Sequence, residues 1–278
     1  MPGGRGGRGG GRGLLPRDVQ VSKKIAWLLR HGAEEEGLQL NEGGFLNVQD
    51  VLGNRKIRSL KVTFDEVRQI VEDNDKKRFT MVPVSSSAAA GGEGEETELA
   101  VSSTKPSEWL IRANQGHSLK VEDEGLLKPI TAENMPDAAV HGTTHAAWPL
   151  IVSAGGLKPM TRNHVHFASG LPAGFKSIAD AESTTDAAAL PVISGMRKSS
   201  TVLMFLDLPK SMEAGLKFWV SDNGVILSEG KDGVVPLEMF KRVEDRTGEG
   251  VLVQDGKVVK ETPGSWAAKG GKGGKGKG

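Results

Sequence analysis

The sequence predicts an α+β protein with a helical N-terminal half and a strand-rich C-terminal half. Segments whose apolar residues follow helical spacing dominate the first 80 residues or so. Short apolar runs punctuated by Gly, Asp and Asn dominate after residue 138. Helices followed by a run of strands are typical of α+β folds. A chain of 278 residues accommodates one large domain or two small ones.

The composition is that of a globular protein, with 37% hydrophobic and 26% charged residues. Without cysteine the chain has no disulfide, no thiol nucleophile and no cysteine-ligated metal. This fits a reducing compartment, so we expect an intracellular protein of the cytoplasm or nucleus. We expect no membrane association, because no apolar run approaches the length of a membrane span and no signal peptide is evident.

The net charge of +1 hides a strong asymmetry between the ends and the middle of the chain. Residues 1–17 contain arginine but no acidic residue, and residues 263–278 carry lysine as their only charged residue. Both tails are too rich in glycine to fold, so we expect them to be disordered. They suit loose attraction to a phosphate backbone. A merely solvated pair of tails is the open alternative.

A first domain is expected over residues 18–120. Its first element is an amphipathic helix over 18–31, capped by Asp18 or Ser22. This helix places Arg30 and His31 in its last turn, where positive charge suits the helix dipole. That position alone could explain both residues structurally.

The next elements are a turn at 42–44, a helix that starts near Asn47, and a helix capped by Thr63 with Glu66. A strand over 78–82 follows.

Residues 85–107 are polar and of low complexity, which predicts a disordered insertion in a hairpin whose second strand resumes at 109–111. Together these elements have the order of a winged helix-turn-helix module. Such modules bind nucleic acid or act as plain interaction domains.

The second domain is expected over residues 138–262, after a linker at 121–137. Its predicted elements are buried strands at 202–206, 216–220 and 224–228, an extended loop at 170–191, a short helix over 235–240, and a hairpin over 251–259 with its turn at Asp255-Gly256.

Histidines gather at the start of this second domain, where residues 140–169 hold four of the six in the chain. The alternation around 164–167 predicts a half-buried strand with His164 and His166 on one face. A lone histidine is more often structural, but this density favours a functional site. Metal binding ranks lower, and we expect no metal, because His-x-His without cysteine or H-E-x-x-H is a weak metal signal.

Arginines accompany three of the histidine motifs: Arg30 precedes His31, Arg112 precedes His117 and Arg162 precedes His164. Guanidinium groups are well suited to phosphate oxygens. These motifs contain no carboxylate, so they lack the pair of acids that a glycosidase uses. The chain also lacks the G-x-S-x-G turn of a serine hydrolase. The residues therefore indicate a site for several phosphates with histidine as the proton-handling group.

The motifs, taken in order, resemble the NAD-dependent tRNA/RNA 2'-phosphotransferase family. The segments that carry the resemblance are 28–31 (LLRH), 111–118 (IRANQGHS), 141–143 (HGT), 156–166 (GLKPMTRNHVH), 193–197 (ISGMR) and 221–227 (SDNGVIL). Each motif is weak alone, but their common order is specific. The resemblance covers residues 18–240 without the two low-complexity insertions.

The resemblance implies an N-terminal winged-helix RNA lobe and a C-terminal ADP-ribosyltransferase-like β-sandwich lobe that binds NAD. It implies that the 2'-phosphate left at a tRNA splice junction attacks C1'' of the nicotinamide ribose and expels nicotinamide. The ribose O2'' then attacks phosphorus, which releases 2'-OH RNA and ADP-ribose 1'',2''-cyclic phosphate. The implied partners are 2'-phosphorylated RNA and NAD, and we expect a monomer.

The resemblance also assigns roles to residues. Arg30, His31, Arg112 and Arg162 are the implied catalytic residues, with His31 assisting the transesterification. The implied NAD-binding residues are His141, Gly142, Thr143, Gly156, Leu157, His164, His166 and Val225. Val225 stands where protein-modifying relatives have a glutamate, and the chain has no tyrosine for their middle signature position.

Two other functions stay open: an ADP-ribosyltransferase that stops after the first step and caps phosphorylated nucleic-acid ends, and a catalytically silent RNA-binding module.

Overall fold

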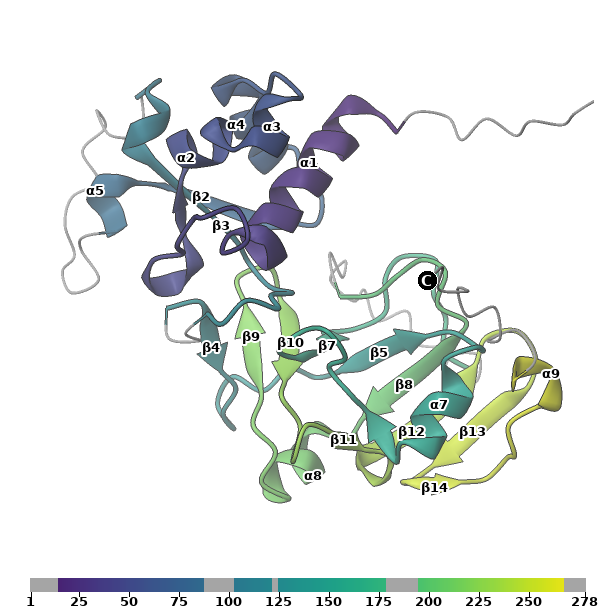
Figure 1. Ribbon diagram of the computed structural model, residues 1–278. Helices are drawn as coiled ribbons and strands as arrows, with labels where there is room; N and C mark the ends of the chain where they lie inside the picture. The colour runs from purple at the N-terminus through teal and green to yellow at the C-terminus, as the bar shows by residue number, and fades with distance from the viewer. Residues whose placement is uncertain (1–14, 88–102, 122–124, 179–194, 268–278) are drawn as a thin grey trace, which may run out of the picture.

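The computed structural model describes residues 15–87, 103–121, 125–178 and 195–267 (Figure 1). A helical N-terminal part lies over a sheet-rich C-terminal part, so the α+β prediction is confirmed. Most of both predicted tails and parts of the two predicted insertions lie outside the described residues.

The first helix, α1, spans Arg17–Trp27 and continues into a π-helical turn, Leu28–Gly32. The predicted side-chain cap at its N-terminus is wrong, because Pro16 occupies the cap position and no side chain bonds the helix there. Proline tolerates this position because it has no N–H to satisfy. Gly32 closes the turn against the Trp27 ring, where a Cβ atom would come within 2.3 Å of ring carbon.

Further helices and a small sheet complete the N-terminal part. The helices are α2 (Val48–Gly53), α3 (Arg55–Arg58), α4 (Phe64–Glu72) and the short α5 (Val84–Ser87), which lies in the chain between the second and third strands. The sheet has the order β1 (Leu46–Asn47), β3 (Trp109–Ala113), β2 (Phe79–Pro83). The predicted helix start near Asn47 is confirmed, and the Asn47 side chain caps that helix by accepting from Gln49 N. The predicted cap at Thr63 is also confirmed, because its hydroxyl accepts from Glu66 N.

The C-terminal part is built on a nine-stranded antiparallel sheet. Its order is β14 (Lys257–Val258), β13 (Gly250–Gln254), β12 (Phe240–Asp245), β8 (Val202–Leu206), β5 (Val140–Thr143), β7 (Val165–Ala168), β10 (Val225–Ser228), β9 (Trp219–Ser221), β4 (Leu127–Pro129). The predicted linker therefore contributes β4 as an edge strand. One apolar cluster includes residues of β7, β8, β10, β12 and β13 together with Trp148, so the sheet curves around a shared core.

The helices of this part are α7 (Trp148–Ser153) and α8 (Leu208–Glu213), which lie between strands, and α9 (Gly264–Ala267), which follows the last strand. A separate pair of strands is formed by β6 (Gly156–Leu157) and β11 (Val235–Pro236). The short helix predicted over 235–240 is present only as a 3-10 helix, Leu237–Met239. Val235–Pro236 instead form β11, which pairs with β6, and Phe240 begins β12.

The predicted hairpin is confirmed between β13 and β14. Its turn residues Asp255 and Gly256 both have positive φ, 49° and 79°. This is the backbone that two-residue hairpin turns of type I′ require.

The two parts contact each other through polar bonds. Asn223, in the turn between β9 and β10, donates through Nδ2 to Lys76 O at 3.0 Å. Asn163 donates through its backbone N–H to His117 O and through Nδ2 to Leu119 O. These bonds tie the loop after β3 to the segment that precedes β7.

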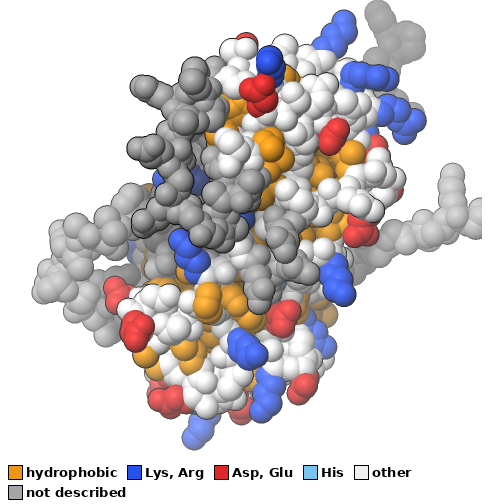
Figure 2. Space-filling view, turned by 90° about the vertical axis from the view of Figure 1, so that its left-hand side faces the viewer, with side chains coloured by type: hydrophobic (Ala, Val, Ile, Leu, Met, Phe, Trp, Pro, Cys, Tyr) orange, Lys and Arg blue, Asp and Glu red, His pale blue; other side chains and the backbone are white. Residues whose placement is uncertain are grey.

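In the described part of the chain, every helix is too short or too polar to cross a bilayer. On the face drawn in Figure 2, basic and acidic side chains are interspersed and apolar atoms form small patches.

Candidate active site

Arg30 and His31 lie in the π-helical turn after α1, and the loop after β3 anchors that turn. Arg30 O accepts from the backbone N–H groups of Ser118 (3.0 Å) and Leu119 (3.3 Å). His31 Nδ1 lies 2.8 Å from Ser118 Oγ. Single π-helical turns are frequent at functional sites. Here the turn holds two adjacent functional side chains against a loop almost 90 residues further along the chain.

The Arg30 guanidinium is half-buried and has spare donors. Its Nε and Nη2 atoms are buried without a hydrogen-bond partner among the described residues. Gly116 packs beside it, and a Cβ there would lie 3.7 Å from Arg30 Nε and Cζ. Burial, followed by repulsion from Arg162 and Arg78, lowers the Arg30 pKa to about 10. At neutral pH Arg30 is therefore charged, and its buried Nε and Nη2 groups can donate to a bound ligand.

Arg162 adds a second cation close enough to influence Arg30. Arg162 lines a hollow, and the residue as a whole is exposed. Its guanidinium is only partly buried, and this burial, followed by repulsion from Arg197, lowers its pKa. Neither Arg30 nor Arg162 pairs with a carboxylate among the described residues. On the face in Figure 2, in contrast, cations and acids alternate. Converging cations without acids form a site for a multiply charged anion.

The exposed side chain of His31 lies among these cations. Burial first, and then Arg30 and Arg162, lower the His31 pKa below its usual 6.5. The ring is therefore neutral at pH 7. A neutral imidazole has one nitrogen able to accept a proton, so His31 can act as a general base beside a bound anion.

Arg112 lies in a different environment from Arg30 and Arg162. Its Nη1 donates to the carbonyl oxygens of Gly43 (3.1 Å) and Gly125 (2.6 Å), and its Nη2 pairs with Asp222 Oδ2 at 2.7 Å. The side chain is buried on β3 and does not line the hollow. Three acceptors hold this guanidinium in place. Its positive charge is also one of the causes that lower the pKa of His117.

A hollow of about 580 Å³ opens beside His31 and Arg162 in the C-terminal part. Most of the predicted NAD-binding residues line it: His141, Gly142, Thr143, Gly156, Leu157, His164 and His166. The volume lies within the usual range for small-molecule sites. None of the described residues that line it is acidic. The hollow therefore suits an anionic ligand of dinucleotide size.

Gly142 has a steric role in the wall of the hollow. A Cβ at this position would come within 2.5 Å of Met196 Cγ and Ser200 Oγ. Glycine thus allows the 196–200 segment to pack directly on β5.

The two histidines at the back of the hollow are held neutral. His141 Nδ1 donates to His166 O at 2.8 Å, which fixes its ring. Burial, with Arg162 as the next cause, lowers the His166 pKa to about 3. Its Nδ1 bonds His164 O at 2.9 Å, while its buried Nε2 has no partner in the described part of the chain. A buried polar atom without a partner suggests that a ligand completes the site.

Two sequence expectations about the strands around the hollow need correction. Val165 and Phe167 join the core as expected, but β7 is buried on both faces rather than half-buried. Val225 does not line the hollow, because it packs against Leu126, Leu127 and Leu227 in a separate apolar cluster. Val225 pairs with Ala168 and Leu227 pairs with His166, so Val225 shares the face of His166, but it is covered there by Leu126 and Leu127.

Sequence reasoning missed several residues of the site. Arg197 and Ser200 line the hollow, and Arg78 at the start of β2 acts on the Arg30 pKa. Arg197 belongs to the ISGMR motif and Arg78 to a KKR run, so both were visible as basic residues. Nothing local connected them to the histidine motifs, because the fold brings them there.

Metal binding finds no support in the described residues, where no group of three or more His, Asp or Glu side chains is arranged to hold an ion.

Known proteins share much of this sequence. The "tRNA 2'-phosphotransferase 1" of Danio rerio is 38% identical over 245 residues, covering 87% of this chain and 92% of that protein. The "tRNA 2'-phosphotransferase" of Saccharomyces cerevisiae is 32% identical over 82% of this chain and 84% of its own length. The "Putative tRNA 2'-phosphotransferase" of Schizosaccharomyces pombe is 37% identical over 86% of this chain but only 55% of its own length.

A sequence model of one family matches residues 16–230, which contain all of the site described above. By this match and by the identities to its relatives, the chain belongs to the RNA 2'-phosphotransferase, Tpt1/KptA family of transferases.

Proposed function

We propose that this protein transfers the splice-junction 2'-phosphate of ligated tRNA to NAD, with a winged-helix lobe that binds RNA and an ADP-ribosyltransferase-like lobe that binds NAD. The products are 2'-OH RNA, nicotinamide and ADP-ribose 1'',2''-cyclic phosphate. One observation carries the proposal: among the described residues, the unpaired cations Arg30 and Arg162 meet beside a neutral His31 at the mouth of an acid-free hollow.

The 2'-phosphate is the ligand proposed for Arg30 and Arg162. A phosphate monoester carries close to two negative charges at neutral pH. The buried Nε and Nη2 of Arg30 offer two donors on one side of a planar fork, a geometry that matches two phosphate oxygens. The same cations offset the charge that builds up on phosphorus oxygens when the phosphate is transferred.

NAD is proposed to occupy the hollow. Its volume of about 580 Å³, its lining of histidine, threonine, serine and apolar side chains, and the unpartnered His166 Nε2 fit a ligand with ribose hydroxyls and phosphates. NAD supplies a ribose carbon with nicotinamide as its leaving group. No carboxylate is among the described lining residues, so none is available to accept a proton from a neutral nucleophile. This supports a nucleophile that is already an anion and needs no such activation.

His31 is proposed to take the proton of the ribose O2'' in the second step. It is neutral at pH 7 and held by Ser118 through Nδ1, which leaves Nε2 to face the reactants. Arg112 remains in the proposed site in a supporting role, because its ion pair with Asp222 holds β3 and the Arg30-binding loop against the β9–β10 turn.

Product analysis tests the proposal. The chain is mixed with NAD and an oligonucleotide that bears one internal 2'-phosphate. We expect 2'-OH RNA and nicotinamide in equal amounts, together with the cyclic phosphate of ADP-ribose. Persistent ADP-ribosylated RNA would instead identify an end-capping ADP-ribosyltransferase. Binding of RNA without cleavage of NAD would identify a silent RNA-binding module.

A further inference from the structure

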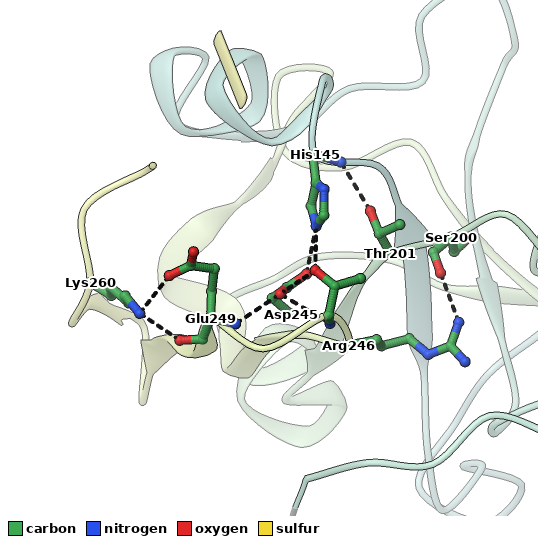
Figure 3. Close-up of polar contacts among 8 residues, drawn as sticks. His145, Ser200, Thr201, Asp245, Arg246, Glu249 and Lys260 are labelled. Carbon is green, nitrogen blue, oxygen red and sulfur yellow. Dashed lines mark hydrogen bonds and ion pairs between the residues drawn. The ribbon is translucent and has the colours of Figure 1, made fainter. Parts of the chain in front are cut away.

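A second polar cluster is centred on His145 and Asp245 (Figure 3). His145 Nε2 lies 2.6 Å from Oδ1 of the buried Asp245, at the end of β12. Because a carboxylate accepts, the ring proton is on Nε2. The other oxygen, Asp245 Oδ2, accepts from Thr247 Oγ1 at 2.7 Å and from the backbone N–H groups of Thr247 and Glu249.

The last described segment of the chain covers this cluster. We call residues 259–267, which include α9, the C-terminal strap. The Trp266 ring stacks on His145, with ring centroids 4.0 Å apart and 14° between the planes, and only 6% of Trp266 is exposed. The strap is attached at its other end by Lys260, whose Nζ bonds Glu249 Oε2 at 2.7 Å (Figure 3). It lies beyond residue 230, where the family match ends.

The cluster connects to residues that line the hollow through hydrogen bonds of backbone and side-chain groups. His145 N donates to Thr201 Oγ1 at 3.1 Å, and Thr201 N donates to Thr143 O at 2.8 Å. Arg246 donates through N to Thr201 O and through Nη1 to Ser200 O. Thr143, Thr144 and Ser200 line the hollow, whereas His145 does not. His145 therefore faces the strap, and its neighbours face the ligand.

We propose that Trp266 and Asp245 are positioning residues for NAD: by clamping His145 from two sides, they hold the 143–147 loop and Ser200 in the conformation that binds the dinucleotide. This inference rests on the proposed use of the hollow for NAD. It extends the working site to a segment outside the family match. The phosphate-binding cations Arg30 and Arg162 make no contact with this cluster among the bonds of the described residues.

The clamp predicts a defect in NAD binding without a defect in RNA binding. An aromatic stacking pair contributes stability beyond its buried area. We expect Trp266→Ala to raise the Kd and KM for NAD roughly tenfold. The KM for 2'-phosphorylated RNA should change less than about twofold. Trp266→Phe keeps a ring on His145 and should restore most of the NAD affinity.

Isothermal titration of the full chain with NAD measures the affinity without requiring turnover. Hydrogen exchange without NAD is the second measurement, and amides of 140–147 and 199–202 should exchange faster in Trp266→Ala while those of 28–32 do not. If Trp266→Ala does not fold, Trp266→Leu retains bulk without a planar ring and takes its place. A chain that ends at residue 267 is the control and should bind NAD as the full chain does.

The outcomes are separable. If the unaltered chain binds NAD and Trp266→Ala binds it equally, the clamp is wrong and the proposed function stands. A lower melting temperature with unchanged NAD affinity and unchanged exchange in 140–147 would show that Trp266 only stabilises the fold, which also overturns the inference. If the unaltered chain does not bind NAD at all, the proposed use of the hollow fails, and the inference fails with it.

Discussion

Two buried or half-buried arginines of this protein differ in how their donors are used. Arg112 gives both Nη groups to two backbone carbonyls and to Asp222, and of its nitrogens only Nε is buried without a partner among the described residues. Arg30 keeps Nε and Nη2 buried without partners among the described residues, beside Arg162 and Arg78. A guanidinium that is paired with a carboxylate stabilises structure, while one with spare buried donors, no carboxylate partner and like-charged neighbours costs stability. Such a cost points to a ligand, so this difference separates a structural arginine from a candidate catalytic one.

The strongest test of this comparison removes the spare donors. We expect Arg30→Ala or Arg162→Ala to lower kcat/KM for a 2'-phosphorylated oligonucleotide by roughly 100- to 1,000-fold, the loss typical of a donor that stabilises transition-state charge. Steady-state product formation with NAD measures it. Arg58→Ala, an exposed arginine of α3, is the matched control and should keep full activity. Full activity in Arg30→Ala would remove Arg30 from the site.

A second test uses the pH dependence of stability. Burial first, and then Arg30, lower the His117 pKa from 6.5 to about 4. Between pH 6.5 and pH 4 the unfolded chain therefore binds more protons than the folded chain. The stability that neutral His117 contributes above pH 6.5 is lost as the pH falls through 4. For one such histidine the loss is on the order of 3 kcal/mol.

Urea unfolding of the unaltered chain and of His117→Gln, at pH 7 and at pH 4.5, measures this effect. Other titrating groups cancel in the difference between the two proteins. We expect the variant to lose less stability on acidification. An equal loss in both would contradict a neutral, buried His117.

A third test measures how much Arg112 contributes to the free energy of unfolding. Arg112→Ala leaves two carbonyls and Asp222 without their partner, and we expect it to lower the free energy of unfolding by about 1–3 kcal/mol. Asp222→Asn keeps an acceptor near Nη2, and 34% of the Asp222 side chain is exposed, so we expect a loss of under about 1 kcal/mol. Denaturant unfolding compares them. If Arg112→Ala is fully stable yet inactive, Arg112 takes part in the chemistry directly.

The smallest expected effect concerns the pH profile of the reaction. Because the His31 pKa lies below 6.5, kcat should be independent of pH around 7 and should fall only on further acidification, as the base becomes protonated. A rate profile at saturating NAD between pH 5 and 8 measures this limb. His31→Ala should lower the rate and abolish the limb. A limb that persists in His31→Ala belongs to another group.

Much of the fold follows from local sequence. The Thr63 and Asn47 caps, the buried strand at Val202–Leu206 and the Asp255-Gly256 turn were all predictable, because each depends on a few neighbouring residues. The short helix expected over 235–240 is reduced to the 3-10 helix Leu237–Met239, because Val235 and Pro236 pair with the distant strand β6, which the local sequence does not reveal. The edge strand β4 was hidden in the predicted linker, because a three-residue strand has almost no periodicity of its own.

In the site, too, some features follow from the sequence and others only from the tertiary structure. The sequence alone determined which residue types were available: arginines beside histidines, no cysteine, and no carboxylate within those arginine–histidine motifs. Only the tertiary structure decided their use, by pairing Arg112 with Asp222, 110 residues away, while leaving Arg30 without a carboxylate partner beside Arg162 in the described part of the chain, and by placing Trp266 on His145. The physical reason is that a side chain's charge and donors are encoded at its own position, whereas its partners come from whichever distant segments the core packing brings together.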